Sequence, residues 1–309
     1  MRRYQTWLME GLCAATLLLG TIVAGPVAAI EFRQITKSTS TAWCPAWSPD
    51  AMLIAFQSSR DGTDNLWIIP ATGEPAIQLT HDAALDAFPT WSPTGTEIAF
   101  MSQRGGDYDL WLIPSTGGTA TALTFDPGYD GPPAWSPDGT QIAFCSDRSG
   151  NLDVWVMPAT GGAATQLTTD PAWDGFPAWS PDGSEIAFSS NRSGNSDLWV
   201  IPVAGGAARQ LTTHQENDEY PSWSPDGERI AFHSLRSGNM DIWVVPAAGG
   251  EAQQITTHPS SDGQPAWSPA GDAIVFYSHM NGTLELWAAT DLPAPVEPTS
   301  WGRIRRHYQ

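Results

Sequence analysis

The sequence of 309 residues predicts an all-β fold, a six-bladed β-propeller whose blades each contain four antiparallel strands. Three observations carry this prediction. A unit of 44 residues occurs six times, each copy holds four short apolar runs separated by turn residues, and no helix-length amphipathic segment follows the N-terminal leader. Four-stranded units of this kind close into a ring without leaving a long exposed sheet edge.

The repeat is marked by two tryptophans in every copy. One opens a turn motif and the other lies in the third apolar run, and neither spacing contains an insertion. The first series is Trp47, Trp91, Trp135, Trp179, Trp223 and Trp267, and the second is Trp67, Trp111, Trp155, Trp199, Trp243 and Trp287. Constant spacing over six copies predicts equivalent units stacked on one another.

Within one copy the four apolar runs are short and the residues between them are typical of turns. The third copy contains PAW, QIAF, DVWVM and ATQLT in order over residues 133–168. Ser-Pro-Asp-Gly at 136–139 supplies a Pro and a Gly suited to a hairpin, and Gly161 and Gly162 do the same between the third and fourth runs. We therefore expect four antiparallel strands per copy, with the Asp of the motif acting as a turn residue.

The two ends of the repeat region predict how the ring closes. EFRQIT at 31–36 matches a fourth run that has no copy before it, whereas LELWAAT at 284–290 is a third run with no fourth run after it. We expect the N-terminal strand to complete the last blade.

The segments outside the repeats have a different composition. Residues 1–29 resemble a secretory signal peptide, with Arg2 and Arg3 before an apolar stretch and small residues at 27–29; a retained N-terminal helix is the alternative. The expected organisation is therefore a leader at 1–29, a propeller at 30–290 and a C-terminal tail at 291–309. The tail holds a small basic cluster, Arg303, Arg305 and Arg306.

The charge balance bears on the choice of partner. The chain has 33 Asp and Glu against 14 Lys and Arg, a formal net charge of −19. Such a surface repels nucleic acid and anionic lipid, so we expect no nucleic-acid partner and no membrane insertion once the leader is removed.

Sequence signals for catalysis or metal binding are weak. The G-x-S-x-G elbow and the H-E-x-x-H pattern do not occur. Cys44 and Cys145 stand at different places in copies one and three, which predicts buried free thiols rather than a disulfide. We expect no cofactor, no metal and no catalytic residue, and acid–base chemistry by His233 or His279 is the alternative.

A charged pair recurs with the repeat. Five copies carry an Arg and five carry an Asp, and each series lacks one member because Met280 and Ala42 stand in its place. The series are Arg60, Arg104, Arg148, Arg192 and Arg236, and Asp86, Asp130, Asp174, Asp218 and Asp262. The two losses coincide if each Arg faces the Asp of the next copy, which predicts ion pairs between adjacent blades. A ring of carboxylates that binds a cation at the channel mouth is the alternative.

Candidate partner-binding residues stand in the loops between copies, where the copies differ most. These loops meet at one rim of the ring, and aromatic side chains stand among carboxylates there. The candidate rim residues are Trp43, Tyr129, Trp173, Glu216 and Glu219. Phe88, Phe176 and Tyr220 share one repeat position, and we expect them to pack between blades.

A second variable position lies between the constant Phe and Ser of the second run. It holds Gln57, Met101, Cys145, Ser189, His233 and Tyr277. This mixture predicts a ligand pocket near the rim, and core side chains fitted to each neighbour are the alternative.

One stretch also resembles a known family. LTTDPAWDGFPAWSPDGSEIAFSSNRSGNSDLWVIPVAGG, residues 167–206, is similar to the repeat of TolB-type propellers, which are WD-repeat-like, and the resemblance spans residues 32–290. It implies a six-bladed propeller in the periplasm that binds partner proteins of the cell envelope. Its motifs are specific for fold rather than for function.

The leading hypothesis is a secreted or periplasmic, noncatalytic propeller, expected to be a monomer, whose loop rim binds a protein or peptide. Two alternatives stay open. One is a lactonase-like propeller hydrolase with an acidic channel mouth able to bind a metal, and the other is a carbohydrate-binding module that uses the rim tryptophans.

Overall fold

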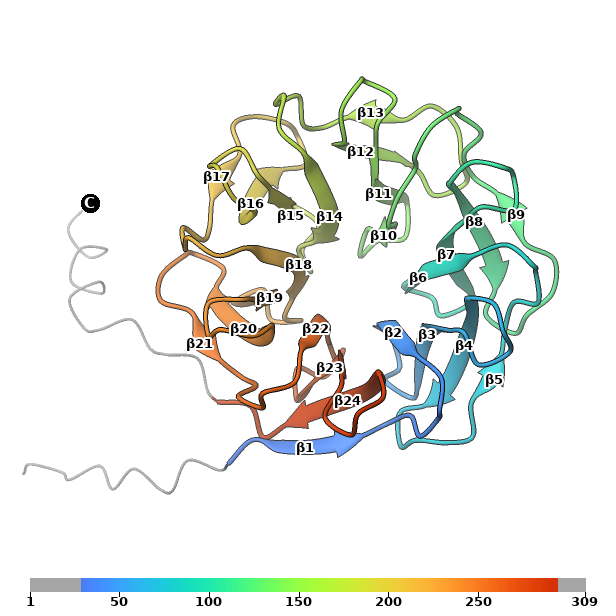
Figure 1. Cartoon of the computed structure of the whole chain (residues 1–309). Coiled ribbons are helices and arrows are strands. Elements are labelled where there is room, and N and C mark those ends of the chain that lie inside the picture. Colours follow the sequence, from blue (N-terminus) through green and yellow to red (C-terminus); the bar gives the residue numbers. More distant parts are fainter. Residues whose placement is uncertain (1–28, 294–309) are drawn as a thin grey trace, which may run out of the picture.

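The computed structural model describes residues 29–293, which form a closed ring of six four-stranded antiparallel sheets (Figure 1). These residues contain no helix. The prediction of an all-β, six-bladed propeller is therefore confirmed. The predicted leader at 1–29 and tail at 291–309 lie outside the described residues, apart from residue 29 and residues 291–293.

The blades follow one another around the ring in chain order, each with its first strand beside the central channel and its last strand at the outer edge (Figure 1). Blade 1 comprises β2 (Ala42–Trp47), β3 (Leu53–Ser58), β4 (Asn65–Pro70) and β5 (Ile77–Gln78). Blade 2 comprises β6 (Asp86–Trp91), β7 (Glu97–Ser102), β8 (Asp109–Pro114) and β9 (Thr121–Ala122). Blade 3 comprises β10 (Ala134–Trp135), β11 (Gln141–Ser146), β12 (Asp153–Pro158) and β13 (Thr165–Gln166).

Blades 4 to 6 repeat the pattern. Blade 4 comprises β14 (Asp174–Trp179), β15 (Glu185–Ser190), β16 (Asp197–Pro202) and β17 (Arg209–Gln210). Blade 5 comprises β18 (Asp218–Trp223), β19 (Arg229–Ser234), β20 (Asp241–Pro246) and β21 (Gln253–Gln254). Blade 6 comprises β22 (Asp262–Trp267), β23 (Ala273–Ser278), β24 (Glu285–Thr290) and, as its outer strand, β1 (Glu31–Gln34).

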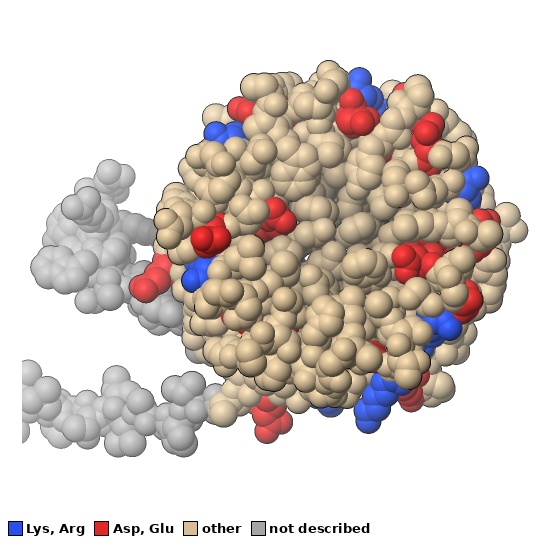
Figure 2. Space-filling model, in the orientation of Figure 1, with Lys and Arg blue, Asp and Glu red and all other residues tan. Residues whose placement is uncertain are grey.

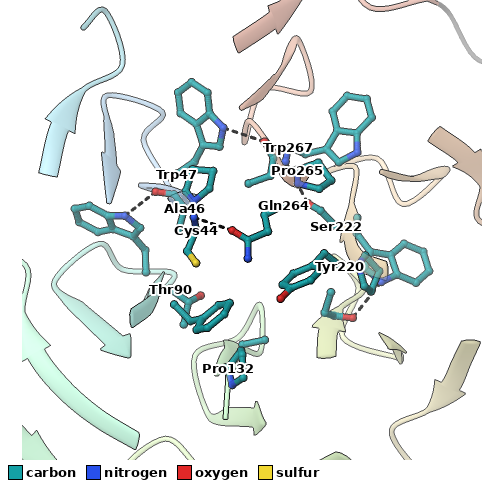
Figure 3. Close-up of a pocket in the computed structure, with 18 of the residues that line it drawn as sticks. Cys44, Ala46, Trp47, Thr90, Pro132, Tyr220, Ser222, Gln264, Pro265 and Trp267 are labelled. Atoms are coloured by element: carbon teal, nitrogen blue, oxygen red, sulfur yellow. Dashed lines mark hydrogen bonds between the residues drawn. The ribbon is translucent and has the colours of Figure 1, made fainter. Parts of the chain in front are cut away.

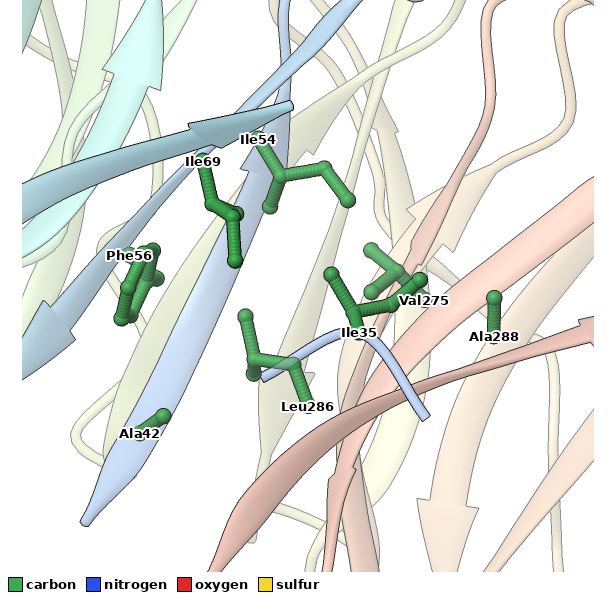
Figure 4. Close-up of a cluster of buried hydrophobic side chains, with 8 residues drawn as sticks. All are labelled: Ile35, Ala42, Ile54, Phe56, Ile69, Val275, Leu286 and Ala288. Atoms are coloured by element: carbon green, nitrogen blue, oxygen red, sulfur yellow. The ribbon is translucent and has the colours of Figure 1, made fainter. Parts of the chain in front are cut away.

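The ring is closed by the N-terminal strand, as predicted. β1 pairs antiparallel with β24, and the amide of Ile35 donates a hydrogen bond of 2.8 Å to the carbonyl of Leu286. The side chain of Ile35 is buried with Leu286, Val275 and Ile54 in one cluster at the junction of blades 1 and 6 (Figure 4). Burial of apolar area at this junction is what holds the first and last blades together.

The other blade junctions are built from the same repeated residues. Between blades 1 and 2, Leu66 of β4 packs in one cluster with Ile98 and Phe100 of β7, and all three are fully buried. In four blades the tryptophan that precedes the hairpin turn adds a polar contact, as the indole Nε1 of Trp91 does by donating to the carbonyl of Ala46 in the preceding blade at 3.1 Å. Equivalent bonds are made by Trp47, Trp179 and Trp223.

The repeated Arg–Asp pairs lie within blades, so the prediction that they link adjacent blades is wrong. Asp86 at the start of β6 pairs with Ser102 at the end of β7, and this register puts the side chain of Arg104 beside Asp86. Arg104 Nη2 lies 2.6 Å from Asp86 Oδ2. The other pairs are Arg148–Asp130, Arg192–Asp174 and Arg236–Asp218.

Blades 1 and 6 each lack one residue of the Arg–Asp pair. Blade 1 has Ala42 at the Asp position, so the nearest carboxylate to Arg60 is Glu74, at 3.9 Å. Blade 6 has Met280 at the Arg position, and neither carboxylate oxygen of buried Asp262 has a hydrogen-bond partner among the described residues. Burial raises the pKa of Asp262 to about 6.

Candidate partner-binding site at the channel mouth

The central channel has two chemically different ends. The first strand of each blade runs from the loop between blades to the hairpin turn before the second strand, so these loops all lie at one end of the channel and the turns at the other. We call the two ends the loop face and the turn face. Figure 2 shows one face of the ring, with a hollow at its centre and charged side chains mainly toward its outer part.

A bulge in the first strand turns one side chain of most blades toward the channel. In blade 2 the strand register shifts between Ala87 and Thr90, and Phe88 has a φ of 51°. Such left-handed backbone is costly for a residue with a side chain, and the paired strand on either side of the bulge holds it in place. Blade 3 has Pro132 at the equivalent position, and the proline ring fixes φ at about −65°. This blade therefore forms no such bulge, and its first strand is reduced to Ala134–Trp135.

The bulged side chains meet at the channel and constrict it. The ring centroids of Phe176 and Tyr220 lie 3.7 Å apart, and that of Phe88 lies 6.4 Å from each. The amide of Cys44 donates to Gln264 Oε1 at 2.9 Å between blades 1 and 6. We expected the three aromatic rings to pack between blades, and instead they stack on one another from blades 2, 4 and 5.

Two of the predicted rim aromatic residues, Trp173 and Tyr129, each lie over a glycine at the repeat position just before the bulge. A Cβ on Gly175 would lie 2.6 Å from Cζ2 of Trp173, and a Cβ on Gly131 would overlap the ring of Tyr129. The absence of a side chain at these glycines therefore lets each ring lie flat against the inner strand. Trp173 also packs edge-on against Phe176, with ring centroids 5.5 Å apart.

Blade 6 supplies a third aromatic ring at this end by a different route. Tyr277 comes from the second strand, β23, and its ring occupies the space that a Cβ on Gly263 would need. In blade 1 the inner strand carries an aromatic residue itself, because Trp43 stands at the position of these glycines and is half-buried. Aromatic side chains from four blades therefore line the loop-face end of the channel, which we call the loop mouth.

The phenols at the channel are neutral hydrogen-bonding groups. Burial raises the pKa of Tyr277 to about 12 and also raises the pKa values of Tyr129 and Tyr220. Tyr277 donates its hydroxyl to the sulfur of Met240 at 3.3 Å. A ligand at the loop mouth would meet ring faces and phenolic hydroxyls rather than phenolate charge.

Blade 5 places the charged side chains of the predicted site. Glu219 takes the strand position that holds glycine in blades 3, 4 and 6, and its Oε2 lies 3.7 Å from His233 Nε2. The neighbouring His233 side chain lowers the pKa of Glu219, so the carboxylate is ionised at neutral pH. Glu216 is exposed in the preceding loop, where its amide donates to His214 Nδ1 at 3.1 Å.

The other candidate pocket residues are packed into the blades. Gln57, Met101, Ser189 and His233 are buried, and each pairs with a residue of the innermost strand beside the loop mouth. Cys145 is likewise buried, and both Cys145 and Cys44 are free thiols, as predicted. Among this series Tyr277 alone is half-buried, so it is the member that a ligand at the loop mouth could contact.

Most of the repeated carboxylates are held in ion pairs. Four of the five repeated Asp side chains bind an Arg of their own blade, and Asp262 has no such partner. Across residues 29–293, no group of three His, Cys, Asp or Glu side chains is placed to hold a metal ion. Nor does this part of the chain contain a helix long and apolar enough to cross a membrane.

A well-defined cavity of about 410 Å³ lies at the turn face, which the sequence did not lead us to expect (Figure 3). The bulged residues form its inner end, and its walls repeat with the blades. They are the six residue triplets of Pro, a small residue and Trp at 45–47, 89–91, 133–135, 177–179, 221–223 and 265–267. The signal for it was present in the sequence, because a Pro and a Trp two residues apart precede every hairpin turn.

The fold and the channel define a closed propeller of six tryptophan-marked repeats. A family model described as the TolB beta propeller domain matches residues 21–132 and 126–220, and the model of the Tricorn protease N-terminal beta propeller domain matches residues 194–290. The chain belongs to the TolB beta-propeller family, as the resemblance of its repeats predicted.

Solved structures with the same fold include proteins of different kinds. A putative TolB from Agrobacterium tumefaciens is 24% identical with a TM-score of 0.67, covering 86% of this chain and 98% of that one. TolB from Acinetobacter baumannii is 20% identical with a TM-score of 0.62, covering 86% of this chain and 65% of that one. An oligogalacturonate lyase from Vibrio parahaemolyticus is 15% identical with a TM-score of 0.59, covering 85% and 97%. At these identities the likeness concerns the fold alone, and no curated protein matches the sequence.

Proposed function

We propose that this chain is a noncatalytic propeller of the periplasm or the extracellular space that binds a protein or peptide at its loop mouth. The observation that carries the proposal is the placement of Tyr129, Trp173 and Tyr277. Tyr129 and Trp173 share one repeat position and Tyr277 comes from another, yet each ring lies over a glycine at the same end of the channel. The other copies have no Phe, Tyr or Trp at either position, so the repeated architecture does not require these rings.

The chemistry of the loop mouth suits a peptide segment. Rigid aromatic faces supply most of the binding energy in protein interfaces at low entropic cost, and neutral phenols add hydrogen bonds. The ionised Glu219 offers one charge to orient a basic group of the partner. Membership of the TolB beta-propeller family supports a binding role in the cell envelope.

The test uses peptides selected against the purified propeller from a displayed random library, with affinities measured by fluorescence anisotropy. Trp173→Ala should weaken binding about 30-fold, since a central aromatic anchor contributes about 2 kcal/mol. Gly175→Ala should weaken it as well, because the added methyl displaces the Trp173 ring while keeping it in the protein.

Met52→Ala is the matched control, since Met52 is exposed in a hairpin turn on the opposite face. Peptides that bind both loop-mouth variants as tightly as the wild type would contradict the proposal. A loss of affinity for Met52→Ala would place the binding site on the turn face instead.

A carbohydrate ligand is the second candidate, because ring faces beside hydroxyl groups also suit sugars. Trp43, Tyr129 and Trp173 would then bind oligosaccharides, and the same variants tested on a glycan array separate the two ligand classes. Release of product from a glycan or lactone by the wild-type protein, lost in Glu219→Gln, would favour the hydrolase alternative instead.

A further inference from the structure

Ionised carboxylates stand around most of the cavity at the turn face, which we call the turn cavity. The hairpin turn of most blades carries an Asp that accepts a hydrogen bond from the serine hydroxyl of the same turn, as Asp182 does from Ser180 at 2.6 Å. This bond lowers the pKa values of Asp50 and Asp138, and that of Asp182 to about 2. The turns therefore present negative charge to solvent on this face.

Adjacent turns touch, and four of them carry the Asp, so Asp50, Asp138, Asp182 and Asp226 form an acidic rim that is interrupted at Thr94 and Ala270. A Cβ on Gly183 would lie 3.3 Å from Cγ of Pro137 in the preceding blade, and a Cβ on Gly227 would lie 3.3 Å from Cγ of Pro181. These glycines also have φ values near 72°, which a side chain would disfavour. The rim is thus built from contacts between turns and stands around the mouth of the apolar cavity.

The last described residue, Pro293, lies on the turn-face side of the junction of blades 5 and 6. Arg229 Nη1 donates to the carbonyl of Pro293 at 3.0 Å, and the guanidinium carbon of Arg229 lies 4.7 Å from the ring centroid of Trp267. Trp267 is one of the tryptophans that line the cavity. One side chain therefore connects the departure point of the C-terminal segment with the cavity wall.

The segment that follows has the composition to occupy the cavity. Residues 294–309 contain Trp301 and Ile304 among Arg303, Arg305 and Arg306, whereas the rim is acidic. Sixteen residues reach up to about 50 Å when extended, which is ample from Pro293. Apolar groups match the tryptophan and proline walls, and three positive charges match the rim.

We propose that residues 294–309 of the same chain dock on the turn face, with the Trp301 side chain in the turn cavity and the three arginines on the rim carboxylates. This surface is distinct from the loop mouth and the inference does not depend on the proposed function. Its consequence is that the turn face is covered by the chain itself, and the loop mouth is the end of the channel left for a partner.

The experiment places the photo-reactive residue p-benzoylphenylalanine at position 301 of the full chain, expressed with its leader. Irradiation should join it to peptides containing Pro225, Trp267 or Pro269, which line the cavity, within a single chain. The triple substitution R303Q/R305Q/R306Q should reduce the yield about tenfold, because exposed ion pairs contribute modestly and add up. Raising the salt from about 0.01 M to about 1 M should have a similar effect.

Two charge-removing variants, one on each face, test whether the rim carboxylates hold the segment. D182N/D226N removes rim charge and should lower the yield, whereas D107N removes an exposed charge from a loop-face turn and should not. Cross-links confined to the loop face, cross-links only between two chains, or a yield unchanged by the triple substitution would each overturn the proposal.

Discussion

Arg104 and Asp86 form an ion pair inside blade 2, with Nη2 and Oδ2 2.6 Å apart and the carboxylate fully buried. The guanidinium also lies over the rings of Phe100 and Trp111, each with its centroid 5.1 Å from Cζ. The same arrangement recurs in blades 3, 4 and 5. Each pair ties the start of the first strand to the loop after the second strand, so its role is to stabilise one blade.

Blade 6 should be stabilised by completing this pair. Met280→Arg places a guanidinium where buried Asp262 has no partner among the described residues, and we expect an increase of about 1 to 2 kcal/mol in the free energy of unfolding. Urea denaturation measures it. His279→Arg adds the same charge one residue earlier at an exposed position and should change stability little. An equal effect of both variants would count against a specific pair.

The pH dependence of stability should reveal the charge on Asp262. Its pKa of about 6 in the folded state lies above the unfolded value of about 3.9, so ionisation destabilises the fold at neutral pH, and this cost declines as pH falls from about 6 to about 3.9. Asp262→Asn should therefore be more stable than the wild type at about pH 7, by up to about 3 kcal/mol. The difference should shrink toward about pH 5. A difference that is constant with pH would show that Asp262 is not the titrating group.

The tryptophan contacts between blades can be tested with a matched pair. Trp91→Phe removes the indole bond to Ala46 and should destabilise the ring by about 1 kcal/mol beyond the loss of ring size. Trp135 has the same repeat position, but its Nε1 has no partner within residues 29–293, so Trp135→Phe is the control. Thermal unfolding should rank the two variants in that order.

Closure of the ring should depend on Ile35. Ile35→Ala removes a side chain buried among Leu286, Val275 and Ile54, and we expect a loss of about 3 kcal/mol. Phe32→Ala, at a site with 39% of its surface exposed, should cost less. Hydrogen exchange should locate the effect of Ile35→Ala in blades 1 and 6, and uniform loss of protection around the ring would contradict this account.

The ring and its closure were predictable because both follow from periodicity. Unbroken spacing fixes the number of blades, and the unmatched runs before blade 1 and after blade 6 complement each other. The Arg–Asp partners were mispredicted because repeat position alone cannot distinguish a pair within a blade from one between blades. That choice depends on the hairpin register, in which Asp86 lies opposite Ser102.

The loop mouth was predictable only in part. Tyr129 and Trp173 stood out as aromatic residues in the variable loops between copies, and the structure places both beside the channel. The inward stacking of Phe88, Phe176 and Tyr220 depends on left-handed backbone at residues with large side chains, which the sequence does not signal. Tyr277 looked equivalent to buried residues of other blades, and Gly263 is what gives its ring space.

The rings of Phe88, Phe176 and Tyr220 make the axis of the propeller narrow between the loop mouth and the turn face. With centroids no more than 6.4 Å apart, they form an aromatic partition that separates two chemically unlike ends. A molecule entering from either side would meet this partition before it reached the other end.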